Sequence, residues 1–216
     1  MLPLGVLFDM DGTLTDTEKL WFQAETELIA ELGGDWQPGD ERELIGLNLH
    51  DASALLVNRL KLDISPEDFG RILTDRVTEL GRRHGMPWRP GAYELLDLLR
   101  NLDIPSVLVT ASMRRFAQLT LGQAPVGSLE FAVTGEDVVR GKPDPEAYQR
   151  AASLIGVEPR DCVAFEDSVH GLNSARRAGA IAVGVPLNVD ISDVPGVILI
   201  DSLEQVDEDF LRALMR

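Results

Sequence analysis

Residues 5–14 read GVLFDMDGTL, an apolar run that ends in two carboxylates and a glycine. Four consecutive apolar residues are typical of a strand that is covered on both faces, as in a parallel sheet. Asp9 and Asp11 lie two positions apart and leave the strand on the same side, so both are expected to point into one site. In open α/β sheets, ligands bind at the carboxyl ends of the strands, where this pair is placed.

Later apolar runs alternate with helical patterns, which predicts a doubly wound, mainly parallel, Rossmann-like α/β sheet. The predicted strands are Gly5–Phe8, Ser106–Thr110, Leu129–Val133, Cys162–Phe165, Ile181–Gly184 and Val197–Ile200. The helices predicted between the later strands are Ala92–Asn101, Arg114–Gly122, Pro145–Ile155 and Val169–Ala178.

One interval departs from this alternation, because no second strand is expected before about Ile104. The helices predicted in this interval are Thr17–Leu32, Asp51–Leu60 and Pro66–Arg83. The last of them follows Ser65, a serine N-cap with proline at the first helical position. The sequence therefore predicts an all-helical cap, residues 16–87, inserted into an α/β core that consists of residues 1–15 and 88–216.

The chain has 216 residues and a formal net charge of −16 at pH 7. Such a chain lacks the positive surface that binds a phosphate backbone, so no nucleic-acid partner is expected. A small phosphorylated metabolite is compatible with this charge, because salt screens exposed charges over about 8 Å and the local site dominates. The chain shows neither a signal-peptide pattern nor an apolar run of the roughly 20 residues that span a membrane. We therefore expect a cytoplasmic protein that contacts no membrane. We also expect a monomer.

The repulsion between the two carboxylates of the first motif has to be relieved, because like charges this close either raise the pKa of one group or recruit a cation. An ordinary turn is the alternative interpretation, since aspartate and glycine are common in turns. A second strand end, VTAS at residues 109–112, offers a strand-end hydroxyl and backbone N–H groups to a phosphoryl oxygen. Ser112 is explained equally well as the N-cap of the next helix.

Two more segments carry charged residues at positions where a phosphate site needs them. RGKPDPE at residues 140–146 holds Lys142 in a constrained loop, where its ammonium group can neutralise a phosphate, although a solvated loop lysine is the plainer interpretation. The strand 162–165 is followed by Glu166 and Asp167. Their carboxylates can complete a magnesium site, or Asp167 can simply stabilise the start of the following helix.

Together these segments resemble, in order and spacing, the motifs of the haloacid dehalogenase-like hydrolase superfamily. The matching residues are Asp9-x-Asp11-Gly12-Thr13, Thr110, Lys142-Pro143-x-Pro145 and Glu166-Asp167-Ser168-x-x-Gly171. The helical insert is similar to the cap of the beta-phosphoglucomutase-like and sugar-phosphatase branch. The resemblance implies a Mg²⁺-dependent phosphatase that acts on a small phosphate monoester such as a sugar phosphate.

The resemblance also implies a role for each matching residue. Asp9 would attack phosphorus and form a phosphoaspartate, while Asp11 would protonate the leaving oxygen and then deprotonate water. Mg²⁺ would be held by the Asp9 carboxylate, the Asp11 backbone carbonyl and Asp167, with Glu166 near or in its shell. The transferring phosphoryl group would be bound by Thr110, the Ala111 N–H and Lys142. An acid at position 11 favours phosphoryl transfer over dehalogenation, which has no alkoxide to protonate.

Two alternatives remain at this stage. A sugar phosphomutase of the same branch needs an arginine in the loop 45–51, where the alignment places Leu49, and some mutases carry a histidine where this chain has Trp21. Both differences favour water as the phosphoryl acceptor. The other alternative is a catalytically silent binding protein, since a fold does not establish a function. The presence of all five polar catalytic residues argues against it; these are Asp9, Asp11, Thr110, Lys142 and Asp167.

Overall fold

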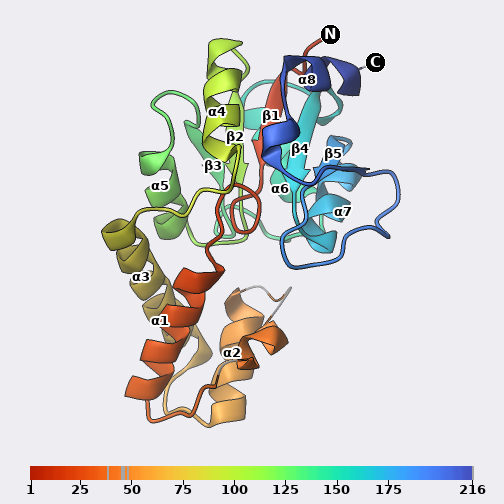
Figure 1. The fold of residues 1–216 in the computed structure, drawn as a ribbon. Coiled ribbons are helices and arrows are strands. Elements are labelled where there is room, and N and C mark those ends of the chain that lie inside the picture. Colours follow the sequence, from red (N-terminus) through yellow and green to blue (C-terminus); the bar gives the residue numbers. More distant parts are fainter. Residues whose placement is uncertain (38, 45–46, 48, 216) are drawn as a thin grey trace.

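A six-stranded sheet with strand order β3-β2-β1-β4-β5-β6 forms the centre of the molecule in the computed structural model, which describes residues 1–37, 39–44, 47 and 49–215 (Figure 1). The strands are β1 (Gly5–Phe8), β2 (Ser106–Val109), β3 (Phe131–Val133), β4 (Cys162–Glu166), β5 (Ile181–Gly184) and β6 (Ile198–Leu199). Every neighbouring pair is parallel. The predicted Rossmann-like α/β fold is therefore confirmed.

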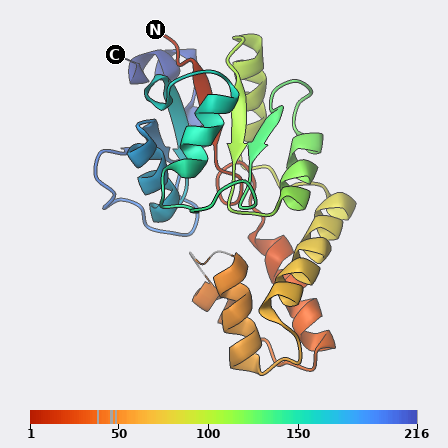
Figure 2. The same ribbon diagram turned by 180° about the vertical axis from the view of Figure 1, so that it is seen from behind.

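Helices cover both faces of the sheet. The core helices are α4 (Ala92–Asn101), α5 (Arg114–Gln123), α6 (Glu146–Leu154), α7 (Val169–Ala178) and α8 (Glu208–Leu214). Val6 and Phe8 belong to an apolar cluster with residues of α4, α5 and α8, whereas Leu7 belongs to a second cluster with residues of α6 and α7. Accordingly, α4 and α8 lie in front of the sheet in Figure 1, and α6 lies in front of it in Figure 2. The alternating side chains of β1 thus anchor both layers.

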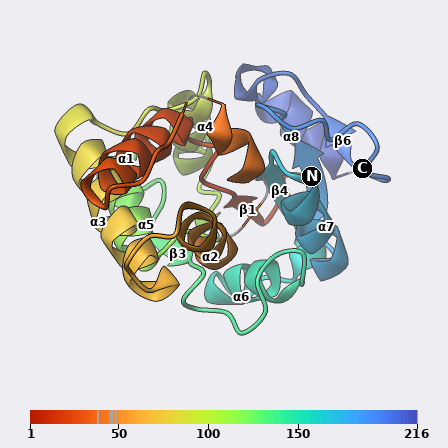
Figure 3. The same ribbon diagram turned by 90° about the horizontal axis from the view of Figure 1, so that it is seen from below.

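A group of helices lies beyond the carboxyl ends of the strands (Figures 1 and 3). We call residues 16–87 the cap segment; its elements are α1 (Glu18–Glu31), the 3₁₀ helix η1 (Asp40–Leu44), α2 (Leu49–Leu60) and α3 (Pro66–His84). Helix α3 packs against α1 and α2, and also against α5 of the core. The Trp21 ring packs edge-to-face on Phe116 of α5, with centroids 5.6 Å apart. The predicted domain boundaries after residues 15 and 87 remain a prediction.

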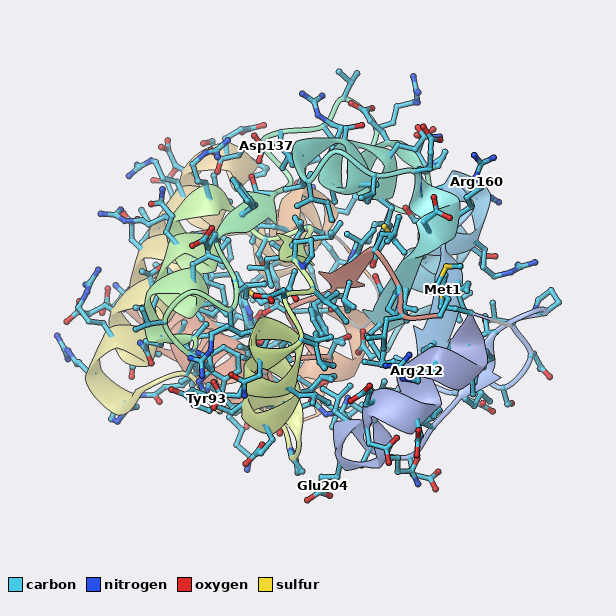
Figure 4. All side chains as sticks on the ribbon, turned by 90° about the horizontal axis from the view of Figure 1, so that it is seen from above. Met1, Tyr93, Asp137, Arg160, Glu204 and Arg212 are labelled. Atoms are coloured by element: carbon cyan, nitrogen blue, oxygen red, sulfur yellow. The ribbon has the colours of Figure 1, made fainter. Side chains whose placement is uncertain are left out.

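The ends of the elements differ from the prediction by one or two residues, as helix and strand ends commonly do. Strand β2 ends at Val109, although the N–H of Thr110 still donates to Val133 O at 2.9 Å. Ser65 caps α3 as predicted, because its hydroxyl accepts the N–H of Asp68 at 3.1 Å. None of the helices in the described ranges is long and apolar enough to cross a membrane. Figure 4 views the core from the end opposite the cap segment, where Met1 and Arg212 lie.

Candidate active site

The motif residues meet because β1 lies between β2 and β4. Phe8 pairs with Leu108 on one side and with Phe165 on the other, so the residues that follow these strands emerge at one edge. The N–H of Asp9 donates to Phe165 O at 3.0 Å, which fixes the first residue beyond β1 against β4. The structure thus places Asp9 beside Glu166 and Asp167, at the edge that faces the cap segment.

Lys142 connects three of these strand ends. Its Nζ donates to Asp9 Oδ1 at 2.6 Å, to Glu166 Oε1 at 2.6 Å and to the carbonyl of Val109 at 2.8 Å. Only 9% of the Lys142 side chain is exposed, so these contacts replace water around its charge. Burial opposes the charge, but attraction from Asp9 and Glu166 outweighs it and raises the pKa of Lys142 above its usual value. The solvated loop lysine considered from the sequence is therefore wrong.

Glu166 is fully buried and saturated with hydrogen bonds. Its Oε1 accepts the hydroxyl of Tyr148 at 2.8 Å in addition to Lys142, and its Oε2 accepts the hydroxyl of Ser168 at 3.0 Å. Burial raises the pKa of Tyr148 well above its usual value, so the phenol remains a donor. A Cβ at position 171 would overlap the Glu166 carboxylate, which explains the glycine there.

Three carboxylates gather around a single ammonium group. One ligand oxygen each of Asp9, Glu166 and Asp167 lies within 4.8 Å of the others. Burial raises the pKa of Asp9 to about 7 against the opposing effect of Lys142, and it raises the pKa of Asp167 to about 9, with the charge of Asp9 adding to this. Asp9 Oδ2 is buried and has no hydrogen-bond partner in the described part of the chain. This excess of negative charge, carried by carboxylate oxygens alone, fits a divalent cation with oxygen ligands.

Asp11 is held differently, by donors from both sides of the boundary between core and cap segment. Its Oδ1 accepts the hydroxyl of Thr17 at 2.5 Å and the indole N–H of Trp21 at 3.4 Å. Its Oδ2 accepts the hydroxyls of Ser112 at 2.7 Å and Thr110 at 3.4 Å. The suggested N-cap role of Ser112 is wrong, since Met113 takes the N-cap position of α5 and the serine hydroxyl binds Asp11 instead.

The family model of the haloacid dehalogenase-like hydrolases matches residues 4–179, a range that contains every motif described above. The chain belongs to this family. Its members that are similar to this chain include sugar phosphatases and beta-phosphoglucomutase-like proteins, so the branch predicted from the sequence is confirmed.

Named relatives of the family match nearly the whole chain. The validoxylamine A 7'-phosphate phosphatase of Streptomyces hygroscopicus subsp. limoneus is 32% identical over 85% of this chain and 86% of its own length. A phosphorylated carbohydrates phosphatase of Thermotoga maritima is 32% identical, with 81% of each chain covered. Among solved structures, CbbY from Rhodobacter sphaeroides in complex with xylulose-(1,5)bisphosphate superimposes with a TM-score of 0.84 at 27% identity, covering 94% of this chain and 96% of that one.

Two residues beside the family motifs were not found by sequence reasoning. Tyr148 resembles any apolar residue on the buried side of α6, and nothing local indicates that its hydroxyl reaches Glu166. Arg89 belongs to none of the sequence motifs, yet its guanidinium donates to the carbonyls of Gly12 and Val185. Of the loop used to weigh the mutase alternative, Ile45, Gly46 and Asn48 lie outside the described residues.

Proposed function

We propose that this phosphatase of the haloacid dehalogenase-like family hydrolyses a small phosphorylated carbohydrate through a phosphoaspartate on Asp9, with Mg²⁺ as its cofactor. One observation carries the proposal. Lys142 holds one oxygen of the Asp9 carboxylate at 2.6 Å, while the other oxygen is buried and unpaired in the described part of the chain. A carboxylate fixed through one oxygen presents the other to phosphorus without reorganisation.

The charge around Asp9 suits a phosphoryl group in transfer. Asp9, Asp167 and the Asp11 backbone carbonyl would hold Mg²⁺, which supplies neutralisation of the phosphoryl oxygens when bound. Glu166 would stand beside the ion, because its oxygens already accept hydrogen bonds from Lys142 and from hydroxyl groups. The same ammonium group of Lys142 stabilises negative charge that develops on the phosphoryl oxygens, together with Thr110 and the N–H of Ala111.

Asp11 supplies the proton transfers in this proposal. It gives a proton to the leaving oxygen as the phosphoaspartate forms, and then takes one from the water that hydrolyses this intermediate. Asp11 accepts hydrogen bonds from Thr17 and Trp21 of the cap segment, which supports a position beside the leaving group of a substrate bound between cap segment and core. Closure of the cap segment over this edge would exclude bulk water.

The substrate class rests on the relatives and on the charge of the chain. Relatives that match most of the chain are named as phosphatases of phosphorylated carbohydrates, including validoxylamine A 7'-phosphate. The net charge of −16 favours a small substrate over a nucleic acid. A cytoplasmic location and a monomeric state remain part of this proposal.

A panel of phosphorylated metabolites, assayed for released phosphate with Mg²⁺ and with EDTA, tests the proposal. The wild-type chain is expected to release phosphate from hexose or polyol phosphates only with metal, and Asp9→Asn is expected to lose this activity. Inactivity of the wild-type enzyme toward the whole panel and toward p-nitrophenyl phosphate would support a silent binding protein. Isomer formation from a β-hexose 1-phosphate with a bisphosphate activator, without phosphate release, would establish the mutase instead.

A further inference from the structure

Residues 87–89 form the linker through which the chain returns from the cap segment to the core. This linker is hydrogen-bonded to the loop that follows Asp11. Pro87 O accepts the N–H of Asp16 at 2.8 Å, and the N–H of Arg89 donates to Leu14 O at 2.8 Å. The two connections between core and cap segment therefore run together, and Arg89 enters the core beside the first motif.

The guanidinium of Arg89 binds three backbone carbonyls from separate segments. Nη1 donates to Gly12 O and, at 2.9 Å, to Val185 O; Nη2 donates to Pro186 O at 3.1 Å. The side chain is half-buried, and burial lowers the pKa of Arg89 while the charge of Asp167 acts in the opposite direction. A planar group with five fixed donors suits three rigid acceptors, and a lysine ammonium cannot reproduce this fork. Arg89 thus ties the loop after β1 to the end of β5.

Gly12 is the part of the first motif that Arg89 fixes. Its φ of +90° favours glycine, and a Cβ at this position would overlap the Asp167 carboxylate. The N–H of Gly12 donates to Thr15 O at 2.7 Å. Because N–H and C=O point in opposite directions in a trans peptide, this bond sets the direction of the Asp11 carbonyl. Arg89 holds the other end of the same residue, so Gly12 is fixed on both sides against Asp167.

We propose that Arg89 is a positioning residue that holds Gly12 against Asp167 and so aims the Asp11 carbonyl at the cation site. The inference rests on the function proposed above, and it adds a residue that belongs to none of the motifs. If Arg89 positions the Asp11 carbonyl, its removal should change the strength of Mg²⁺ binding in one direction, and if it acts only through its charge, in the opposite direction. A misplaced carbonyl weakens Mg²⁺ binding, whereas the loss of a nearby positive charge alone strengthens the binding of a cation.

Two variants and a matched control test this inference. Arg89→Met removes the fork and the charge, Arg89→Lys keeps the charge without the fork, and Arg160→Met removes an exposed arginine at the opposite edge of the sheet (Figure 4). Isothermal titration with MgCl₂ alone measures metal binding, and p-nitrophenyl phosphate at saturating Mg²⁺ measures kcat and KM. We expect Mg²⁺ binding about tenfold weaker and kcat about tenfold lower in both Arg89 variants, with KM little changed, because small displacements in such sites cost one to two orders of magnitude in rate.

The outcomes separate this inference from the proposed function. Mg²⁺ binding by Arg89→Met that equals or exceeds that of the wild type would overturn the positioning role; if this variant does not fold, the same comparison with Arg89→Lys decides. A lower melting temperature with unchanged Mg²⁺ binding and kcat would reduce Arg89 to a structural residue. A wild-type chain that binds Mg²⁺ but releases no phosphate from any ester refutes the proposed function, and the Mg²⁺ titrations of the Arg89 variants still test the positioning role.

Discussion

The ammonium group of Lys142 lies 2.6 Å from Glu166 Oε1, in an ion pair whose side chains are only 9% and 0% exposed. Removing one member of a buried pair is costly, since the remaining charge keeps its burial and loses its compensation. Lys142 also binds Asp9, so its loss leaves two buried carboxylates without a cation of the protein.

Lys142→Met is therefore expected to lower the free energy of unfolding by about 3 to 5 kcal/mol and to abolish phosphate release. Urea denaturation of the metal-free protein measures the first effect. The control is Arg140→Met, which breaks the exposed pair with Asp144 and should cost about 0 to 1 kcal/mol. The double variant Lys142→Met/Glu166→Met should regain stability but no activity; if it is no more stable than Lys142→Met, the ion pair does not explain the loss.

Tyr148 leads to a milder prediction, because its hydroxyl is one of several donors to Glu166. Tyr148→Phe keeps the ring, which lies 5.3 Å from Lys142 Nζ, and removes only the 2.8 Å hydrogen bond. Loss of a hydrogen bond to a charged group is expected to cost about 1.5 to 3 kcal/mol of stability, measured by urea denaturation. The control is Tyr93→Phe, which alters an exposed ring on α4 and should leave the unfolding curve unchanged. Equal curves for both variants would contradict the role given to the Tyr148 hydroxyl.

The residues that sequence reasoning found and the residues that it missed differ in whether they belong to a local sequence motif. Asp9, Lys142 and Asp167 were predicted because each follows a strand or precedes a helix in a motif of fixed spacing, and parallel strands bring their carboxyl ends to one edge. Tyr148 and Arg89 make their contacts across the fold, with partners 18 and 77 or more residues away in sequence. No local pattern encodes such a contact, so the supporting network became visible only in the structure.

In the fold as well, the features that depend on neighbouring residues were predicted, and features without a local pattern were not. Apolar runs and helical periodicity gave the α/β alternation, because each depends on neighbouring residues. The short 3₁₀ helix η1 was not predicted, since five residues show no helical period. Ser112 was assigned to a helix cap because capping is the commonest local role of such a serine, and its actual partner, Asp11, lies on another strand end.

The raised pKa values of Asp9 and Asp167, about 7 and about 9, predict how pH acts on the metal-free protein. Both exceed the ordinary value of 3.8, so the folded state holds more protons than the unfolded state between about pH 4 and about pH 9. The free energy of unfolding should therefore fall as pH rises through this window. Thermal denaturation in EDTA over this range measures the effect, and Asp167→Asn should make the decline shallower.

Mg²⁺ should reverse this decline, because it replaces the protons that the two carboxylates bind. The increase in melting temperature on adding Mg²⁺ is expected to grow from about pH 6 to about pH 9. Titration calorimetry in two buffers with different ionisation enthalpies should detect proton release near neutral pH. An Mg²⁺ effect that is independent of pH, with no released protons, would mean that these carboxylates do not bind the ion.

Asp11→Asn separates the two proton transfers assigned to Asp11. p-Nitrophenolate leaves without a proton, so the variant should still form the phosphoaspartate from p-nitrophenyl phosphate, and then stall because no base activates water. Stopped-flow absorbance is therefore expected to show a burst of about one p-nitrophenolate per enzyme, followed by turnover slowed about 10²- to 10⁴-fold. A hexitol phosphate has a poor leaving group, so rapid-quench measurement of the released hexitol should show no burst. Asp9→Asn, which lacks the nucleophile, should give no burst with either substrate. If Asp11→Asn instead reacts slowly with p-nitrophenyl phosphate and shows no burst, Asp11 acts in the formation of the phosphoaspartate alone and not in its hydrolysis.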